Sequence, residues 1–556
     1  MNLRKGLIKH LNLIADLLEF NSANKFKVNA FRNGANILRR LGPDIEIKIK
    51  NGTIRDIKGI GKGLQTVIYE FYHSGNSTEL SELLEKTPHG ILELLNIRGL
   101  GTSKIKLLNK ELNISNIKGL EQACSNNSIA SLKGFGEKTQ EKILTEIKRI
   151  KENRSKVLLS EALEIANEIK SSFNNFDSVL KIKISGDLRR RVEIISKLEF
   201  VLLVKSYADF ENEIKDNRLY AKELDHDTSS KILKLQTEYK PKILLYLTTN
   251  ENEFETILFK STGSEEFIQH LGADKSNYSN SPESKVFEEQ GIPYVIPEMR
   301  EKEYYRAPDK FRGNSNLEIN QFKGLLHFHT DWSDGINTLS EMIDAAISRG
   351  FLYAAVCDHS KSAFYANGLN EERVLKQKEE IDKLNKVKNI KIYQGIESDI
   401  LRDGKLDYDN DFLDNFDFIV ASVHSQFNLT EEEMTKRVIR AIENPHTNLI
   451  GHPTGRLLLR RDPYSINLNK VIDACTQNNV AIEINANPNR LDLDWRMIYY
   501  AREKGCKFAI NPDAHSVDGI DDIKYGIMIA RKGGIQKDEV INTYEINEFE
   551  NFLNKN

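Results

Sequence analysis

The sequence predicts a protein of several domains, with a helical front end and an α/β portion at the C-terminus. Three observations support this fold class. The chain has 556 residues, which is too long for one hydrophobic core. Its first 150 residues combine apolar residues at helical spacing with a short glycine motif that occurs three times. Beyond residue 320, short apolar runs alternate with helical patterns, as in parallel β/α folds.

Charge is distributed unevenly along the chain. Residues 1–150 contain 24 Lys and Arg against 15 Asp and Glu, a net charge of +9. Because the whole chain carries −3, the other 406 residues carry −12. A basic front end on an acidic remainder indicates that the front end holds a polyanion. Chance variation in charge is the competing explanation.

Composition argues against membrane and disulfide-rich classes. No run of 18 apolar residues occurs, so we expect no membrane span. The first 20 residues are charged throughout, unlike a signal peptide. The four cysteines are far apart and lack CxxC spacing, which is typical of reduced thiols: Cys124, Cys357, Cys475 and Cys506. We therefore expect a cytoplasmic protein.

The first 80 residues predict a small helical domain. Leu7, Leu11, Ile14 and Leu17 recur at the spacing of one helix face, and a second such face follows around Phe31. These residues are expected in the core of the bundle.

A Gly-x-Gly motif preceded by a hydrophobic and a basic residue occurs three times, each time before a helical stretch. Its glycines are Gly59 and Gly61, Gly99 and Gly101, and Gly134 and Gly136. Glycine allows a tight turn and a close approach of backbone N–H groups to an anion, and the following helix begins with its positive end there. This pattern is a helix-hairpin-helix, which binds DNA phosphates without reading bases. We expect these six glycines to contact DNA; a purely structural helical array is the alternative.

Nine side chains with metal-binding chemistry occur in the last 240 residues. They are His327, His329, Asp334, His359, Glu397, His424, His452, Asp513 and His515. Each lies in or beside a short apolar run that reads as a buried parallel strand. The carboxyl ends of such strands meet at one edge or rim. Six imidazoles and three carboxylates collected there favour two or three divalent metal ions.

Three nearby residues are less clear from the sequence. Asp331 competes with Asp334 for a place among the ligands. Asp358, beside His359, is expected either to orient an imidazole or to cap a helix. His446 follows Asn-Pro in a polar loop and is not expected to be a ligand.

The motifs together resemble bacterial family X DNA polymerases that carry a C-terminal PHP (polymerase and histidinol phosphatase) domain. The PHP motifs are LHFHTDWSDG at 326–335, VCDHS at 356–360, GIESDI at 395–400, SVHS at 422–425, GHP at 451–453 and NPDAHS at 511–516. The resemblance implies a distorted (β/α)7 barrel. It also implies a metal-dependent phosphoesterase with Mn²⁺ as the expected metal and Zn²⁺ or Fe²⁺ as alternatives. The expected catalytic residues are His327, His329, Glu397, Asp513 and His515.

The middle of the chain resembles the palm and thumb of the same family but departs from its catalytic pattern. The sequence SGDLRRR at 185–191 matches a palm motif in outline. Lys197 and Glu199 stand where the family has two aspartates, and the alignment puts Leu245 at the third. Two Mg²⁺ ions need carboxylate oxygens, and an ammonium group opposes them. The sequence therefore predicts a degenerate polymerase site that has lost nucleotidyl transfer; a register error of a residue or two is the alternative.

Four domains are expected from these patterns. They are a helical domain with the first hairpin at 1–80, a fingers-like helix-hairpin-helix domain at 81–150, an α+β polymerase-like palm and thumb at 151–315, and the PHP domain at 316–556.

The expected function is a DNA-repair phosphoesterase acting on gapped, nicked or recessed ends, as a 3′–5′ exonuclease, 3′-phosphatase or abasic-site endonuclease. Arg456 and Arg460, close after His452, are candidates for binding phosphate oxygens. Three alternatives stay open: an active family X polymerase with exonuclease activity, a small-molecule phosphatase of the histidinol-phosphatase type, and a non-catalytic DNA-binding scaffold.

Overall fold

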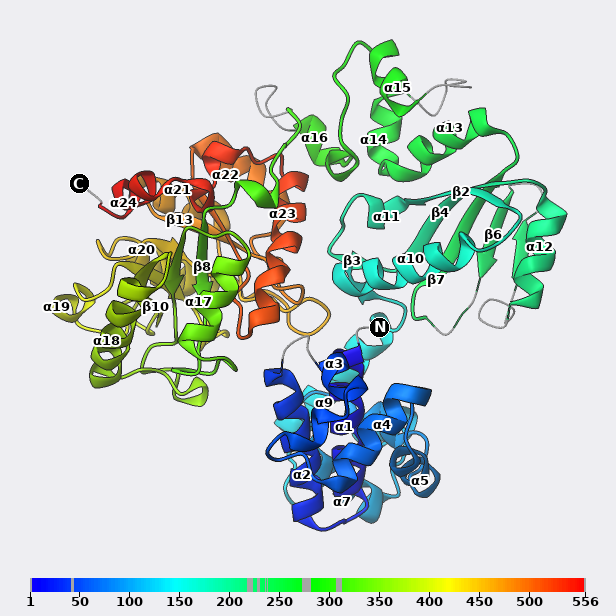
Figure 1. The fold of residues 1–556 in the computed structure, drawn as a ribbon, viewed down its shortest axis with the longest axis horizontal. Helices are drawn as coiled ribbons and strands as arrows, with labels where there is room; N and C mark the ends of the chain where they lie inside the picture. Colours follow the sequence, from blue (N-terminus) through cyan, green and yellow to red (C-terminus); the bar gives the residue numbers. More distant parts are fainter. Residues whose placement is uncertain are drawn as a thin grey trace. The chain divides into compact units, whose positions relative to one another are not determined.

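The computed structural model describes residues 3–41, 45–217, 224–227, 231–235, 237, 239–272, 282–306 and 313–554 (Figure 1). Its contacts divide the chain into two compact units, Met1–Arg154 and Ser155–Asn556. The four finer domain ranges stay predictions. Over the residues that the structure describes, no helix has the length and apolar character needed to cross a membrane.

The first unit is helical, as predicted, and contains two separate cores. One core joins α1 and α2 with α4 and α5, and includes Leu7, Leu11 and Phe31. The other is formed mainly by residues 91–147. The helices are α1 Leu3–Phe20, α2 Lys25–Arg40, α3 Ile45–Lys50, α4 Lys62–Ser74, α5 Thr78–Lys86, α6 Ile91–Leu95, α7 Thr102–Leu112, α8 Ile117–Ser125 and α9 Glu137–Glu152.

The second unit begins with a mixed five-stranded sheet in the order β2-β4-β7-β6-β5. Strands β4 and β7 run parallel and the other neighbours antiparallel. The strands are β2 Val179–Ser185, β4 Lys197–Val204, β5 Leu224–Asp227, β6 Ile232–Leu235 and β7 Lys242–Thr248, and a small pair is formed by β1 Val157–Leu158 and β3 Ile194–Ile195. The helices of this region are α10 Leu159–Phe173, α11 Gly186–Arg189, α12 Tyr207–Asp216, α13 Glu251–Thr262, α14 Glu265–His270, α15 Glu283–Glu289 and α16 Lys302–Arg306.

Helices cover both faces of this sheet. Phe200 and Leu202 of β4 pack into the core that includes α10 and α12. Val201 and Leu203, which point to the opposite face, pack against Phe254 and Leu258 of α13. Glu199 shares the α13 face because side chains two apart on a strand point the same way.

A buried ion-pair network holds α15 to this region. Glu283 accepts two hydrogen bonds from Arg189 at 2.6 and 2.7 Å and two from Arg300 at 2.9 and 3.3 Å. The Arg300 guanidinium lies over the rings of Phe259, Phe287 and Tyr294. Burial raises the pKa of Glu283, but the two arginines outweigh it and lower that pKa to about 2.

We expect Glu283→Gln to lower the free energy of unfolding of this region by roughly 3 kcal/mol, because it leaves the buried Arg300 and the half-buried Arg189 without their carboxylate. The parent should lose its advantage as the pH falls from 4.5 towards 2, since the depressed pKa stabilises only while the carboxylate is ionised. Thermal and urea unfolding from pH 7 to pH 2 measure the difference. The exposed Glu288→Gln on the same helix is the matched control, and equal behaviour of the two variants would contradict the assignment.

The C-terminal region is the predicted seven-stranded parallel barrel. Its strand order is β14-β13-β12-β11-β10-β9-β8, and a parallel bridge between Phe328 and Ala514 joins the two ends. The strands are β8 Gly324–Phe328, β9 Tyr353–Val356, β10 Lys391–Asp399, β11 Phe418–Ser422, β12 Leu449–Ile450, β13 Ala481–Asn485 and β14 Phe508–Asn511. The helices are α17 Leu339–Ser348, α18 Glu371–Val387, α19 Asn410–Leu413, α20 Glu431–Ile442, α21 Leu468–Gln477, α22 Ile498–Lys504, α23 Ile523–Lys532 and α24 Ile546–Leu553.

Helix α24 packs against the amino-terminal ends of the barrel strands. Phe549 stacks on Tyr353, the first residue of β9, with ring centroids 4.7 Å apart, and lies beside Phe418, the first residue of β11. These side chains form a core with Leu326, Ala355 and other strand residues. The apolar packing at this end leaves the carboxyl-terminal end of the barrel for polar side chains.

Candidate functional site

The carboxyl-terminal end of the barrel collects all nine predicted metal ligands. Glu397 lies on β10, and His327 is next to the last residue of β8. The others follow the strand ends: His329 and Asp334 after β8, His359 after β9, His424 after β11, His452 after β12, and Asp513 and His515 after β14. The parallel order of the strands therefore brings together residues that are almost 190 positions apart in sequence.

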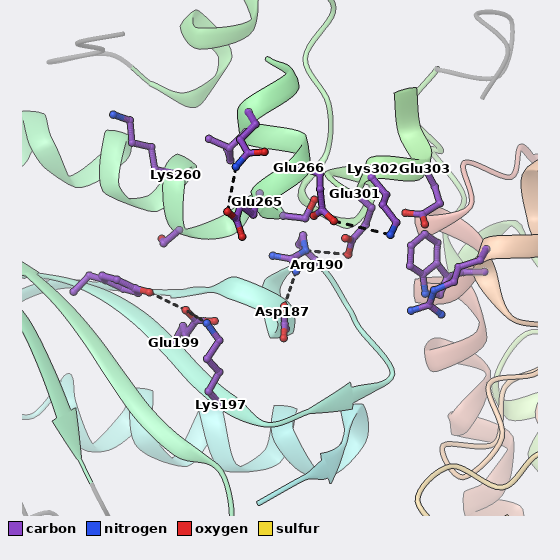
Figure 2. A pocket seen from close by; sticks show the side chains of 18 residues that line it. Asp187, Arg190, Lys197, Glu199, Lys260, Glu265, Glu266, Glu301, Lys302 and Glu303 are labelled. Carbon is purple, nitrogen blue, oxygen red and sulfur yellow. Dashed lines mark hydrogen bonds and ion pairs between the residues drawn. The ribbon is translucent and has the colours of Figure 1, made fainter. Parts of the chain in front are cut away.

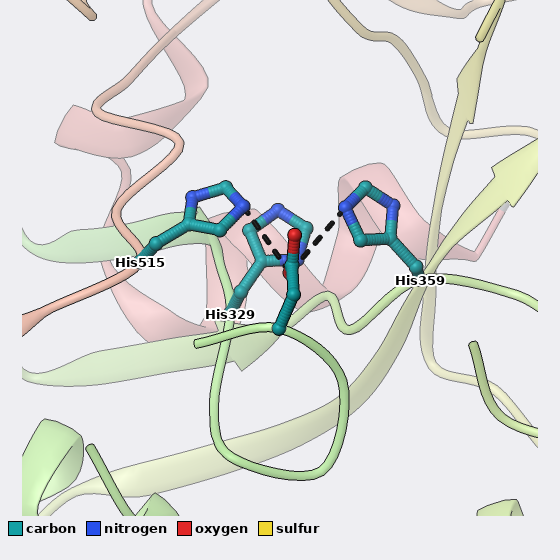
Figure 3. Close-up of side chains that lie close together, drawn as sticks. His329, His359 and His515 are labelled. Carbon is teal, nitrogen blue, oxygen red and sulfur yellow. Dashed lines mark ion pairs between the residues drawn. The ribbon is translucent and has the colours of Figure 1, made fainter. Parts of the chain in front are cut away.

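The ligand atoms form three overlapping groups, each with atoms within 4.8 Å of one another. The groups are His329, Asp334, His359 and His515; His327, His329 and Asp513; and His359, Glu397 and His424. Figure 3 shows the imidazoles of His329, His359 and His515 converging on one carboxylate. That carboxylate is Asp334, whose Oδ1 lies 3.3 Å from His515 Nε2 and 3.6 Å from His359 Nε2. His452 joins the cluster through Glu397, with Nε2 and Oε1 2.9 Å apart.

Further carboxylates orient the imidazoles. Nδ1 of His327 lies 2.6 Å from Glu483 Oε1, and Nδ1 of His424 lies 2.6 Å from Asp399 Oδ1. In each ring the opposite nitrogen, Nε2, faces the ligand cluster. A carboxylate that fixes one ring nitrogen leaves the other free for a metal and raises its basicity.

Three of the predicted ligands have an unusual backbone conformation. His327, His452 and Asp513 have φ values of 59°, 24° and 51°, in the left-handed region that side chains other than glycine rarely adopt. At His327 the pairing of β8 with β9 also shifts register. Such strain persists only where surrounding contacts hold it, and it is typical of functional sites.

Several buried polar atoms of the predicted ligands make no hydrogen bond, although His359 Nδ1 lies 2.9 Å from Glu397 Oε2. They are His327 Nε2, His329 Nδ1, His359 Nδ1, His452 Nδ1 and Glu397 Oε2. An unsatisfied buried polar atom costs stability unless something else binds it. Burial raises the pKa of Glu397, but His424, His359 and His327 outweigh it and hold that pKa well below its usual value. The nitrogen and oxygen donors fit two or three divalent cations of the Mn²⁺, Fe²⁺ or Zn²⁺ class.

The structure also shows where Asp331, Asp358 and His446 lie relative to the ligand groups. Asp331 is exposed and belongs to none of the ligand groups among the described residues, whereas Asp334 does. Asp358 is fully buried and accepts hydrogen bonds from Thr330 and Ser333, so it braces the turn that carries Asp334 rather than an imidazole. His446 lies beside Asp414, away from the ligand groups.

The prediction that Arg456 binds phosphate is wrong. Its guanidinium donates to Asp494 Oδ2 at 2.5 Å and to the carbonyl oxygens of Arg490 and Leu491, so it braces two loops. Arg460 is exposed on the same loop, and its phosphate contact stays a prediction. Lys361, after His359, pairs with Glu371 at 2.6 Å.

Arg490 is better placed to meet a substrate than either predicted arginine. Its Nε lies 3.5 Å from Asp513 Oδ2, at the ligand cluster. Its Nη1 is buried and has no hydrogen-bond partner. Sequence reasoning passed over this residue because its loop, ANPNRLDL at 486–493, carries no metal-ligand signature.

The polymerase-like site lies on β4 and lines a cavity of about 900 Å³ (Figure 2). Glu199 is 3% exposed, and its Oε1 accepts hydrogen bonds from Lys197 Nζ at 3.0 Å and Tyr246 Oη at 2.8 Å. A Cβ at Gly186 would lie 1.9 Å from Glu199 Oε2, so only glycine leaves room for this carboxylate. Asp187, also at the cavity, pairs with Arg190 at 2.5 Å. The lysine ammonium thus lies where a carboxylate-bound cation would be needed.

The assignment of Leu245 to this site is wrong. Leu245 pairs with Phe200 and lies in the hydrophobic core on the opposite face of the sheet. Tyr246 lies on the Glu199 face and lines the cavity. The site therefore has one carboxylate on β4, an ammonium and a phenol.

The three hairpins have the geometry that the glycine motif predicts. Gly59, Gly99 and Gly134 have φ values of 95°, 79° and 94°. Gly61, Gly101 and Gly136 are the N-cap residues of α4, α7 and α9. A Cβ at any of these six positions except Gly59, which meets Ile37, would enter open space. The turns are therefore accessible to a ligand, and their contact with DNA stays a prediction.

Comparisons with known proteins match both the helical front end and the barrel to known families. A helix-hairpin-helix domain model matches residues 2–77 and a PHP domain model matches residues 326–487. The DNA polymerase/3′-5′ exonuclease PolX of Bacillus subtilis (strain 168) is 35% identical over 575 residues, covering the whole of both chains. The chain belongs to the PolX family.

The barrel alone also resembles shorter proteins. A probable phosphatase of Thermoanaerobacter sp. (strain X514) is 28% identical over 228 residues, which cover 39% of this chain and 89% of that protein.

The geometry adds two carboxylates that the sequence did not identify. Glu483 and Asp399 orient His327 and His424. Glu483 also accepts from the backbone N–H of His452 and from Asn511. A glutamate inside the apolar run VAIEIN (480–485) was the available signal, because a lone buried carboxylate needs partners.

We expect Glu483→Gln to weaken Mn²⁺ binding by about 10- to 100-fold, because the neutral amide no longer fixes the charge and orientation of His327. Metal titration of the chelator-treated protein, followed by calorimetry, measures the affinity. The exposed Glu431→Gln changes the same charge away from the cluster and is the control. Equal affinity of the parent and both variants would show that Glu483 does not act through the metal centre.

Proposed function

We propose that this PolX-family chain is a metal-dependent DNA phosphoesterase that processes 3′ ends and has lost nucleotidyl transfer. One contrast carries the proposal. The PHP centre gathers the predicted nitrogen and oxygen donors, and several of their buried atoms make no hydrogen bond. The polymerase-like site has a single strand carboxylate whose oxygen is already engaged by Lys197 and Tyr246.

Bound divalent cations would acidify a water to supply the nucleophile and would neutralise the leaving oxygen. The residues of the chain supply orientation and charge. Glu483 and Asp399 hold His327 and His424 in position, and Asp358 fixes the turn that carries Asp334. Arg490, with a free buried N–H beside Asp513, is suited to bind a non-bridging phosphate oxygen.

The front unit would hold the duplex. Three accessible turns, each at the start of a helix, offer backbone N–H groups to phosphates without base contacts. The net charge of +9 over residues 1–150 adds a non-specific attraction to the DNA backbone.

An active polymerase is the second candidate, favoured by the full-length relative whose name includes DNA polymerase. Primer extension on a gapped duplex with Mg²⁺ or Mn²⁺ separates the two. We expect no incorporation from the parent or from Glu199→Ala, because Glu199 is the one carboxylate that β4 and β7 present at the site and Lys197 already engages it. If the parent incorporates nucleotides and Glu199→Ala does not, the chain is an active polymerase.

We expect His329→Ala to reduce the release of 3′ nucleotides by more than about 100-fold, because His329 belongs to two of the three ligand groups. Glu199→Ala should leave this activity unchanged. Digestion of a 3′-recessed, 5′-labelled duplex with Mn²⁺ measures both variants. Undiminished digestion by His329→Ala would assign the activity to another site or a contaminant.

The basic residue that precedes each hairpin gives a test of DNA binding. We expect the triple variant Lys58→Gln, Arg98→Gln and Lys133→Gln to bind DNA more weakly, with the slope of log K against log salt reduced by about 2 to 3. Fluorescence anisotropy from low to high salt measures the slope.

A matched variant removes the same charge from exposed lysines outside the hairpin turns: Lys86→Gln, Lys110→Gln and Lys148→Gln. It should reduce affinity less and keep most of the slope. If both triple variants behave alike, the attraction is a property of the whole surface.

A further inference from the structure

The loop after His359 is closed at the metal centre. Leu369 N–H donates to the carbonyl oxygen of His359 at 2.8 Å, and Ser360 and Leu369 form a parallel bridge. The chain between them, residues 361–368, therefore leaves the centre and returns to the same ligand. Gly368 makes the closure possible, because a Cβ there would lie 1.9 Å from the Ser360 carbonyl oxygen.

Further hydrogen bonds tie this loop to a second ligand segment. Asn367 Nδ2 donates to the carbonyl oxygens of Trp332 and Ser333 at 3.1 and 3.3 Å, directly before Asp334. Ser362 N–H donates to Asp407 Oδ2 at 2.6 Å. The backbone of the loop is thus fixed between the segments that carry His359 and Asp334.

This fixed loop presents two exposed aromatic side chains. Phe364 and Tyr365, in a short 3-10 turn, are 85% and 65% exposed, with ring centroids 6.2 Å apart. Single exposed apolar residues are common on protein surfaces. Two adjacent rings on a loop held to two metal-ligand segments are a different case, because the fold orders them at the mouth of the site without burying them.

The electrostatic surroundings of Tyr365 agree with a position at this mouth. Partial burial and then the carboxylates of Asp399, Glu397 and Asp334 raise the pKa of its phenol. Arg490, the proposed phosphate-binding residue, acts on the same phenol in the opposite direction. The phenol therefore lies within electrostatic range of the carboxylates of the ligand cluster.

We propose that Phe364 and Tyr365 form a stacking platform for the terminal base of a DNA strand whose last phosphodiester lies at the metal centre. The proposal rests on the proposed function and specifies its substrate: an unpaired 3′-terminal nucleotide. Aromatic rings stack on any base, so the platform tolerates every sequence. The base must leave the duplex stack to reach it, so the platform favours single-stranded and frayed 3′ ends over fully paired ones.

The double variant Phe364→Ala and Tyr365→Ala in the full chain tests the platform with Mn²⁺ present. Two oligonucleotides are compared, one ending in a 3′ thymidine and one ending in a 3′ tetrahydrofuran that lacks a base. The base-free diester bis(p-nitrophenyl) phosphate reports on the centre itself. We expect KM for the thymidine-ended strand to rise roughly tenfold with kcat nearly unchanged. The tetrahydrofuran-ended strand and the diester should be hydrolysed as by the parent.

Conservative and control variants separate stacking from folding. Phe364→Tyr combined with Tyr365→Phe keeps both rings and should keep the parent preference for a terminal base. Val387→Ala, which removes an exposed side chain elsewhere in the barrel region, should change nothing.

Two results would overturn the platform alone: an unchanged KM for the thymidine-ended strand, or an equal loss on all three substrates, which would make the loop a structural support of the centre. A parent enzyme that hydrolyses neither DNA nor the diester with Mn²⁺ would overturn the proposed function, and the platform with it.

Discussion

The dominant constraint in this protein is the burial of many ionisable side chains at one end of the barrel. Nine imidazoles and carboxylates converge there, with Glu483 and Asp399 behind them. Several of their polar atoms make no hydrogen bond with the described residues. Burying such groups is costly unless cations and hydrogen bonds compensate. Apolar packing of α24 closes the other end of the barrel. At the polar end, the backbone of His327, His452 and Asp513 adopts positive φ values, which persist only where surrounding contacts hold them.

The five-stranded sheet of the polymerase-like region also contains a buried carboxylate, but compensates it with side chains of the protein. Glu199 is buried on the strand face that lines the cavity, and its carboxylate is neutralised by the ammonium of Lys197 and accepts a hydrogen bond from the phenol of Tyr246. Because the Lys197 ammonium is part of the protein, the single carboxylate of Glu199 is enough to pair with it, whereas two bound Mg²⁺ ions would need further carboxylates. The surrounding fold persists because its stability comes from the cores on both faces of the sheet and from the Glu283 network. The fold of this region therefore does not depend on a set of metal-binding carboxylates.

In the proposed function, the two halves of the enzyme would recognise different parts of DNA. Glycine turns at helix starts are suited to phosphates far from the reaction. The metal centre, Arg490 and the aromatic loop are suited to the last phosphodiester and its base. Affinity for the duplex and selection of the end would then depend on separate residues, so each can change without the other.

The sequence by itself determined much of this protein. The gathering of the nine polar side chains at one end of the barrel, the barrel itself and the hairpin turns could be predicted because each depends on local pattern: a polar side chain at the end of an apolar strand, or a glycine before a helix. The exceptions were side chains whose role depends on what lies across the fold. Arg456 was expected at phosphate but is held by Asp494, and Arg490 was missed although it lies at the cluster.

Leu245 and Tyr246 are adjacent in sequence and lie on opposite faces of the sheet. An alignment error of one residue therefore assigned the core residue Leu245 to the site in place of Tyr246. The positions of Glu483 and of the loop with Phe364 and Tyr365 near the ligand cluster depend on contacts between distant strands and turns, so the sequence alone could not predict them. Local sequence fixes which side chains are available, whereas the direction and partners of each depend on strand register and long-range packing, which only the tertiary structure decides.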